Sequence, residues 1–307
     1  MTMKIAFNFL PTILLLTTSC FILLVHGILL SANNIVDLEV DIDTLGTSSS
    51  SSSPIVNDQD TTKQQRSTCN IPIVYSFSSF QTSSLPTTPM IIIDKNHSNI
   101  FLAEFGQRDH ILATHGSQLV DLSSSNTYSH GQYRMSLTEF ITNHVDVDIE
   151  TSQSHSSNDT MYLFGKNHET LLFQHMAQLY QNPPCRYCKT PVAVQSIGIG
   201  GRGTGVAFHF HGPGFSEVVI GRKQWFIFPP EYDIPGSHPN ISVSVWAREQ
   251  LPTLMQRDDE LRGVFFHCDI GPGEVLYFPD RWLHATLNRD SYNFFVSLFL
   301  DVQLMKD

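Results

Sequence analysis

Charged residues are scarce in this chain, and positively charged residues are the scarcer kind. Of its 307 residues, 15% are charged, and 18 Lys and Arg against 29 Asp and Glu give a formal net charge of −11. The Lys and Arg residues do not gather into a basic run anywhere in the sequence. Because nucleic-acid backbones are bound by clustered Lys and Arg, the composition argues against nucleic acid as a partner.

Cysteine is also rare, with five residues in all. Apart from Cys20 in the N-terminal apolar run, they are Cys69, Cys185, Cys188 and Cys268. Cys185 and Cys188 form a Cys-x-x-Cys pair, but the sequence holds no second pair to complete a zinc site, so a zinc or redox function has little support. In an oxidising compartment the four cysteines are expected to form disulfide bonds, and three pairings are open.

The chain lacks a retrieval signal of the Lys-Asp-Glu-Leu kind at its C-terminus. Its N-terminus, in contrast, carries a long apolar run, Ile5–Leu30, behind Lys4. Residues 1–30 are therefore predicted to be a signal peptide or, if uncleaved, a signal anchor in contact with the membrane. Either places the folded part in the secretory pathway. We expect the endoplasmic reticulum lumen, with secretion and signal anchoring as alternatives.

Three Asn-x-Ser/Thr acceptors agree with that location. They begin at Asn96, Asn158 and Asn240, each in polar surroundings. Such a triplet is the acceptor sequence for N-glycosylation. We therefore expect a glycoprotein with carbohydrate at these three positions.

Residues 31–68 are polar and contain a low-complexity Ser/Thr stretch around residues 47–53. So few apolar side chains cannot offset the conformational entropy lost on ordering, and a disordered linker is expected there. The folded domain is predicted over 69–302. It would comprise an N-terminal α+β support, 69–191, and an all-β core, 192–302.

The support region is expected to mix short strands with helices. Strands are predicted at Met90–Ile93, His110–Thr114 and Ser117–Leu122. Ser136 and Glu139 form a capping box that opens a short helix to about His144. A longer amphipathic helix is predicted from His168 to Gln181, ending at two prolines.

The core region has the pattern of strands and turns that is typical of a β-barrel. Eight apolar runs separated by Gly, Pro and Asn turns are expected to be strands: Gln195–Ile199, Val206–His211, Phe215–Ile220, Gln224–Phe228, Val264–Cys268, Glu274–Phe278, Trp282–Leu287 and Phe294–Leu300. Short strands of this number and spacing predict a jelly-roll barrel, or double-stranded β-helix. Residues 231–263 interrupt the series, with a helix predicted at Val245–Met255.

Histidines mark the candidate site of this barrel. His209 and His211 are two apart, so on a strand both imidazoles leave the same face. His284 lies on a later strand. Three imidazole nitrogens converging inside a barrel would bind a transition metal and leave coordination positions open.

The motifs Gly203-x5-His209-x-His211 and Gly273-x5-Pro279-x4-His284-x3-Asn288 resemble the two cupin motifs. The flanking stretches, residues 221–230 and 271–284, are similar to those of the JmjC subgroup of cupin-fold proteins. The resemblance is densest over residues 195–300 and weakens towards residue 70.

The resemblance implies a set of site residues. JmjC oxygenases hold Fe(II) with a His-x-Asp/Glu motif and a distal His, which His209 and His284 match. Lys223 matches the lysine that pairs with the far carboxylate of 2-oxoglutarate. Thr204 and Ser297 fall where hydroxyls are often found near that co-substrate.

His211 stands where the family has its carboxylate ligand. A third imidazole leaves the site more positive, which keeps metal binding by Fe, Zn, Mn or Cu but makes efficient 2-oxoglutarate turnover less certain. Glu217 lies later than the acidic residue of the first cupin motif. It is interpreted as a core-edge acid paired with Arg222, with a displaced fourth metal ligand as the alternative.

Two functions of different classes follow. The first is an Fe(II)/2-oxoglutarate-dependent oxygenase that hydroxylates a luminal protein or peptide. The second is a non-catalytic JmjC interaction protein, with homo-oligomers among its allowed assemblies, whose metal is structural or vestigial. A three-His metalloenzyme that does not use 2-oxoglutarate is a third, weaker option. The retained Lys223 and Thr204 favour the first, and His211 favours the second.

Overall fold

The computed structural model describes residues 69–124, 132–146, 161–165, 167–238, 241–257 and 259–306. The predicted signal segment, the predicted linker, Asn158 and Asn240 lie outside these residues. The chain divides into two units, residues 1–55 and 56–307, and every described residue belongs to the second. None of the described helices is long and apolar enough to cross a membrane.

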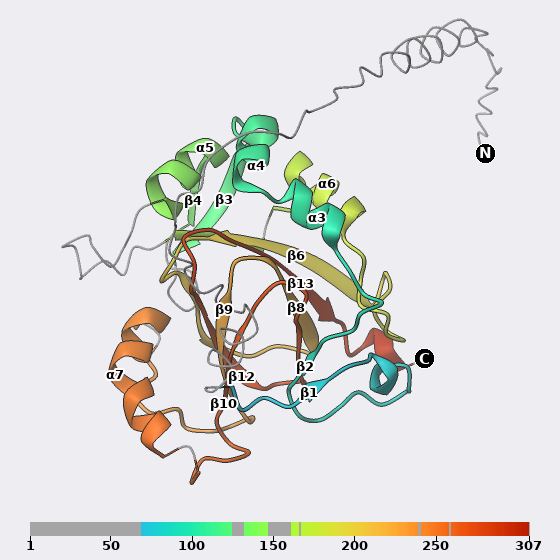
Figure 1. Cartoon of the computed structure of the whole chain (residues 1–307), viewed down its shortest axis with the longest axis vertical. Helices are drawn as coiled ribbons and strands as arrows, with labels where there is room; N and C mark the ends of the chain where they lie inside the picture. The colour runs from blue at the N-terminus through green and yellow to red at the C-terminus, as the bar shows by residue number, and fades with distance from the viewer. Residues whose placement is uncertain are drawn as a thin grey trace, which may run out of the picture. The chain divides into compact units, whose positions relative to one another are not determined.

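The described residues form two β-sheets, flanked by helices (Figure 1). The larger sheet has nine strands in the order β1-β2-β11-β8-β13-β6-β5-β3-β4, and the smaller has four in the order β10-β9-β12-β7. Strands preceding residue 165 are β1 (Ile73–Val74), β2 (Met90–Ile92), β3 (Leu119–Ser124), β4 (Gln132–Ser136) and β5 (Met161–Phe164). The later strands are β6 (Ala193–Gly200), β7 (Gly205–His209), β8 (Gly214–Ile220), β9 (Lys223–Phe228), β10 (Phe266–Ile270), β11 (Val275–Phe278), β12 (Leu283–Asn288) and β13 (Asn293–Leu300).

The eight later strands confirm the predicted jelly-roll core. Each of the eight predicted runs contains or overlaps one of β6 to β13. The β6, β13, β8 and β11 group faces the β10, β9, β12 and β7 group, and apolar side chains from both fill the space between them. Gly198 on β6 leaves room for the ring of Phe295 on β13, because a Cβ there would lie 2.0 Å from the ring. This close approach lets an aromatic side chain turn into the barrel.

The α-helices lie in two groups (Figure 1). Helices α3 (Ile100–Phe105), α4 (Arg108–His115), α5 (Leu137–Phe140) and α6 (Leu171–Leu179) lie together at one side of the large sheet, and α7 (Val243–Gln256) lies beside the small sheet. A π-helical turn, η3 (Ile141–Val145), continues α5, and short 3₁₀ turns occur at η2 (Ser78–Phe80) and η4 (Leu304–Lys306). The first group buries an apolar cluster against the outer face of the large sheet, and α7 buries Trp246 against the small one.

Helix caps behave largely as the sequence predicts. The Ser136 hydroxyl accepts from the backbone N–H of Glu139, and Thr170 and Ser242 cap α6 and α7 in the same way. The predicted strand at His110–Thr114 is wrong, because these residues belong to α4. Asp109 in the first turn and Gly116 after the last are helix-end signals that outweigh the Ile111–Leu112 pair of that run.

The four cysteines form two disulfide bonds, Cys69–Cys268 and Cys185–Cys188. The first joins the start of the described chain to β10 across 199 residues. The second closes the Cys-x-x-Cys pair, whose two side chains are buried. Both cysteines of that pair are therefore bound to each other, and half of a zinc site is not present there.

Candidate metal centre

Strand pairing brings the three histidines together. Strands β7 and β12 are antiparallel neighbours, and His209 and His284 are directly opposed in their register. His211 lies two residues beyond His209. The ring centroids are 4.3 Å apart for His209 and His284, 4.7 Å for His211 and His284, and 5.3 Å for His209 and His211. One ring nitrogen of each lies within 4.8 Å of the others, as a shared metal ion would require.

Each imidazole is oriented by a main-chain carbonyl. The Nδ1 atoms of His209, His211 and His284 lie 2.9, 2.8 and 2.8 Å from the carbonyl oxygens of Ala207, Gly212 and Trp282. A carbonyl can only accept, so each Nδ1 carries the proton and each Nε2 keeps its lone pair. This outer hydrogen bond is the usual support of a metal-bound histidine.

The Nε2 atoms of His211 and His284 are 3.1 Å apart. Two lone pairs at this distance repel each other unless a cation lies between them. Two nitrogens bound to one zinc-sized ion at about 2.0–2.1 Å lie roughly 2.9–3.4 Å apart, depending on the coordination angle. The residues present therefore fit a divalent transition metal.

Burial keeps the three imidazoles neutral, which is the form that binds metal. It lowers the pKa of His209 to about 4, with the nearby His211 adding to the shift. It also lowers the pKa of His211, and holds that of His284 well below its usual value.

A small pocket adjoins the histidines, with a cavity volume of about 20 Å³. Its remaining walls come from β5, β7, β9, β11, β12 and β13 and are mostly aromatic: Phe164, Val206, Lys223, Trp225, Phe278, Thr286, Phe295, Ser297 and Phe299. Aromatic walls of this kind limit water around a bound metal.

Lys223 reaches this cavity from the start of β9. It is 2% exposed, and its Nζ lies 3.2 Å from the centroid of the Phe295 ring. No carboxylate pairs with it within the described part of the chain. Burial holds the pKa of Lys223 well below its usual value, since nothing offsets the desolvation of the ammonium. A buried ammonium with no counter-charge is suited to an anion that enters from outside.

The two predicted hydroxyls behave differently. Ser297 lines the cavity, with its Oγ 3.3 Å from that of Ser216. Thr204 does not line it: its hydroxyl donates to the Gly201 carbonyl and accepts from the Asn288 side chain, which fixes the turn before β7. Thr286 lines the cavity instead. Its position, two residues after His284 on the same strand face, is a signal that the sequence analysis missed.

Trp225 lies at the cavity as well. It is two residues after Lys223 on β9, and therefore on the same face. Its Nε1 is buried and has no hydrogen-bond partner among the described residues. The ring lies near His284, at 5.8 Å between centroids.

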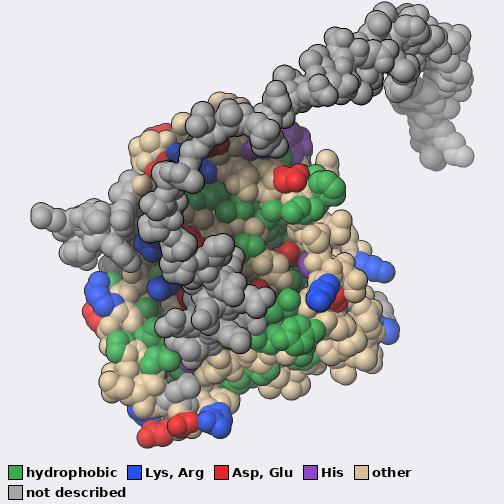
Figure 2. Space-filling view, viewed as in Figure 1, with side chains coloured by type: hydrophobic (Ala, Val, Ile, Leu, Met, Phe, Trp, Pro, Cys, Tyr) green, Lys and Arg blue, Asp and Glu red, His purple; other side chains and the backbone are tan. Residues whose placement is uncertain are grey.

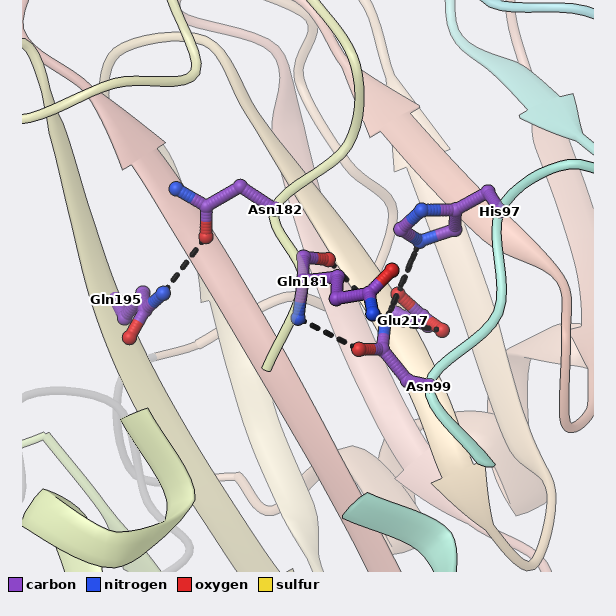
Figure 3. Close-up of polar contacts among 6 residues, drawn as sticks. All are labelled: His97, Asn99, Gln181, Asn182, Gln195 and Glu217. Atoms are coloured by element: carbon purple, nitrogen blue, oxygen red, sulfur yellow. Dashed lines mark hydrogen bonds and ion pairs between the residues drawn. The ribbon is translucent and has the colours of Figure 1, made fainter. Parts of the chain in front are cut away.

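Glu217 is not a metal ligand, and the predicted pairing with Arg222 is wrong. Glu217 does not line the cavity, and its carboxylate lies in a polar cluster with His97 and Asn99, the outer cluster (Figure 3). There it accepts from His97 Nε2 at 2.9 Å and from Asn99 Nδ2 at 2.9 and 3.0 Å. Arg222 is paired with Asp290 instead, at 2.8 Å.

Asn96, the one described acceptor asparagine, is exposed in a turn beside this outer cluster. Its neighbour His97 is buried against Glu217. On the face shown in Figure 2, Lys and Arg lie singly and do not gather into one patch.

Comparison with known proteins identifies relatives of this chain. No family model matches the chain. JmjC domain-containing protein 8 of Mus musculus is 44% identical over 196 residues, which cover 63% of this chain and 67% of the relative. The Homo sapiens protein of that name is 44% identical over 196 residues, 63% of this chain and 69% of the relative. The 2-oxoglutarate and iron-dependent oxygenase JMJD4 of Mus musculus is 30% identical over 96 residues, 30% of this chain and 22% of the relative.

Proposed function

The chain belongs to the JmjC family of cupin-fold proteins, and we propose that it is an Fe(II)- and 2-oxoglutarate-dependent oxygenase acting on a polypeptide in the secretory pathway. The observation that carries the proposal is the combination of three converging imidazoles with a buried, uncompensated Lys223 in one cavity. The relative named as a 2-oxoglutarate and iron-dependent oxygenase supports the same chemistry.

Each group in the cavity has a task in this proposal. His209, His211 and His284 would hold the iron, which, when bound, supplies the activation of oxygen typical of non-haem Fe(II) sites. Lys223 would bind the far carboxylate of 2-oxoglutarate, with the Ser297 hydroxyl nearby. The aromatic walls would exclude bulk water from the reacting groups.

The second candidate is a JmjC protein that binds metal without turnover and acts through protein contacts. His211 favours it, because the site lacks the carboxylate of the 2-His-1-carboxylate arrangement. Three neutral imidazoles leave the full charge of the metal uncompensated. The same set also suits Zn or Mn.

One assay separates the two candidates. The purified protein, loaded with Fe(II) without air and then exposed to it, should convert 2-oxoglutarate to succinate, and His284→Ala should not. A matched His110→Ala variant, altered at an exposed histidine on α4, should retain the activity. Metal bound at one equivalent without succinate formation would favour the non-catalytic candidate.

We also propose residence in the lumen of the endoplasmic reticulum. Two disulfide bonds and an exposed acceptor at Asn96 support an oxidising, glycosylating compartment. Endoglycosidase digestion of the cell-expressed protein should increase its gel mobility. An unshifted band together with four free thiols would place the protein elsewhere.

A further inference from the structure

We infer that the group oxidised at this site is an apolar side chain of a polypeptide, rather than a lysine or arginine side chain. The inference concerns the substrate class and rests on the proposed oxygenase function. It is carried by the charge and the exposure of the residues around the cavity, taken together with the register of β6 and β13.

The wall that runs from the histidines towards solvent is apolar. Phe299 lines the cavity, with its ring 4.7 Å from His211 and 6.2 Å from the ring of Phe164. Val194 lies directly opposite Phe299 on the neighbouring strand β6, and therefore on the same face of the sheet. It is 51% exposed. Phe164, Phe299 and Val194, the apolar wall, thus connect the metal centre to the surface.

No carboxylate lines the cavity among the described residues. With 2-oxoglutarate bound as proposed, Lys223 and the metal would be paired with its carboxylates, so no free negative charge faces an entering group among the described lining residues. A substrate ammonium or guanidinium would therefore have nothing to compensate its desolvation. The charge pattern therefore disfavours a basic side chain.

Two exposed carboxylates outside the cavity, those of Asp280 and Glu231, do not alter this conclusion. Asp280 acts on His211 through its charge, but it is exposed and does not line the cavity. Glu231 is paired with Arg281 at 3.3 Å, and both are exposed. Neither carboxylate is available inside the apolar wall.

Aromatic rings can also attract cations, which makes a methylated lysine the strongest rival occupant. The face of Phe295 is already taken by Lys223, however, with the ammonium 3.2 Å from the ring centroid. The remaining wall includes the aliphatic Val194. Burial of a leucine or phenylalanine side chain against such a wall is favoured by the hydrophobic effect without a charge penalty.

The test uses the whole protein loaded with Zn(II) and saturated with 2-oxoglutarate, so that binding is measured without turnover. Fluorescein-labelled Gly-Ala-X-Ala-Gly peptides with X as Leu, Phe, Lys, trimethyl-lysine or Glu are compared by fluorescence anisotropy. The Leu and Phe peptides should bind at least about tenfold more tightly than the other three.

Val194→Asp places a carboxylate on the apolar wall at an exposed position, so folding should be preserved. The variant should bind the Leu peptide at least about tenfold more weakly and the Lys peptide more tightly. Leu119→Asp is the matched control. Leu119 is similarly exposed, at 55%, on β3 of the same sheet, but its strand partner is Ser136, which does not line the cavity, so its replacement should change neither affinity.

Each outcome has a separate meaning. Equal affinity for all five peptides, preference for Lys or trimethyl-lysine, or no binding of any peptide would overturn the inference. Binding of 2-oxoglutarate is measured in parallel by its effect on the melting temperature. If 2-oxoglutarate does not bind while the Leu peptide does, the oxygenase proposal fails and apolar recognition stands.

Discussion

Two buried polar regions lie on opposite sides of strand β8, and they differ in how their charged groups are paired. On its outer side, the Glu217 carboxylate is 3% exposed and is satisfied by His97 and Asn99. On its inner side, Ser216 faces Ser297 at the edge of a cavity in which Lys223 has no counter-charge. Burying polar groups is costly unless they are paired. The Glu217 carboxylate is therefore satisfied by groups of the protein itself, whereas Lys223 in the inner cavity would be paired only by a bound ligand.

The largest effect is expected from the loss of one imidazole, which should lower the affinity for metal. His284→Ala leaves only His209 and His211 as ligands. We therefore expect metal affinity to fall by more than about 100-fold while the fold is retained. Metal content after dialysis against a weak chelator measures the effect. His97→Ala, which alters a histidine of the outer cluster, should leave metal content unchanged. Equal metal retention in His284→Ala and the parent protein would show that these histidines are not the site.

A change in the outer cluster is expected to lower stability and to leave metal affinity unchanged. Glu217→Leu would leave the buried His97 ring nitrogen without its carboxylate acceptor, at a cost of about 1–3 kcal/mol in the free energy of unfolding. Metal affinity should be unchanged in the remaining folded protein. Chemical denaturation with Glu260→Gln as the control checks this, because the exposed Glu260–Arg257 pair should contribute only about 0–1 kcal/mol. A cost as small as that of the control would mean that the outer cluster does not stabilise the fold.

Lys223→Met removes the uncompensated charge but keeps a long side chain. We expect 2-oxoglutarate to bind at least about tenfold more weakly, since a charge-assisted hydrogen bond is lost. Stability without ligand should not fall, because a buried ammonium no longer has to be desolvated. Isothermal titration and thermal melting measure the two quantities, with the exposed Lys189→Met as control. A strongly lowered melting temperature would indicate that Lys223 has a structural partner instead.

The smallest effect is expected for His211→Asp, which restores the carboxylate of the family pattern. The added negative charge should shift metal preference from Zn(II) towards Fe(II) by about tenfold. It should raise succinate formation if the present site is a weakened oxygenase, and lower it if the three-imidazole set is adapted to its own reaction. Competition between the two metals gives the first result. No change in preference would mean that His211 does not contact the metal.

The sequence predicts the parts of this molecule that depend on local pattern. Apolar runs separated by Gly, Pro and Asn turns identify all eight core strands, and the spacing of His209 and His211 predicts that both line one cavity, although β7 ends at His209. The Ser136 cap is likewise a local signal. The His110–Thr114 strand fails because an apolar pair suits either a helix or a strand.

Contacts between distant residues could not be predicted in this way. The partner of Glu217, His97, lies 120 residues earlier in the chain, whereas Arg222 is only five residues away and was the natural guess. Of three cysteine pairings, only the folded chain selects the one that joins Cys69 to Cys268. Thr204 was assigned from its place in a motif, but its hydroxyl is used by a turn, and Thr286 occupies the cavity wall.

The central claim is that the imidazoles of His209, His211 and His284 bind one divalent metal. X-ray absorption at the zinc edge of the Zn(II)-loaded protein tests it most directly, with the metal content determined on the same sample. The account predicts one metal per chain, coordinated by imidazole nitrogens at about 2.0–2.1 Å, and loss of this signal in His284→Ala. Sulfur neighbours at about 2.3 Å, or a spectrum unchanged by His284→Ala, would contradict it.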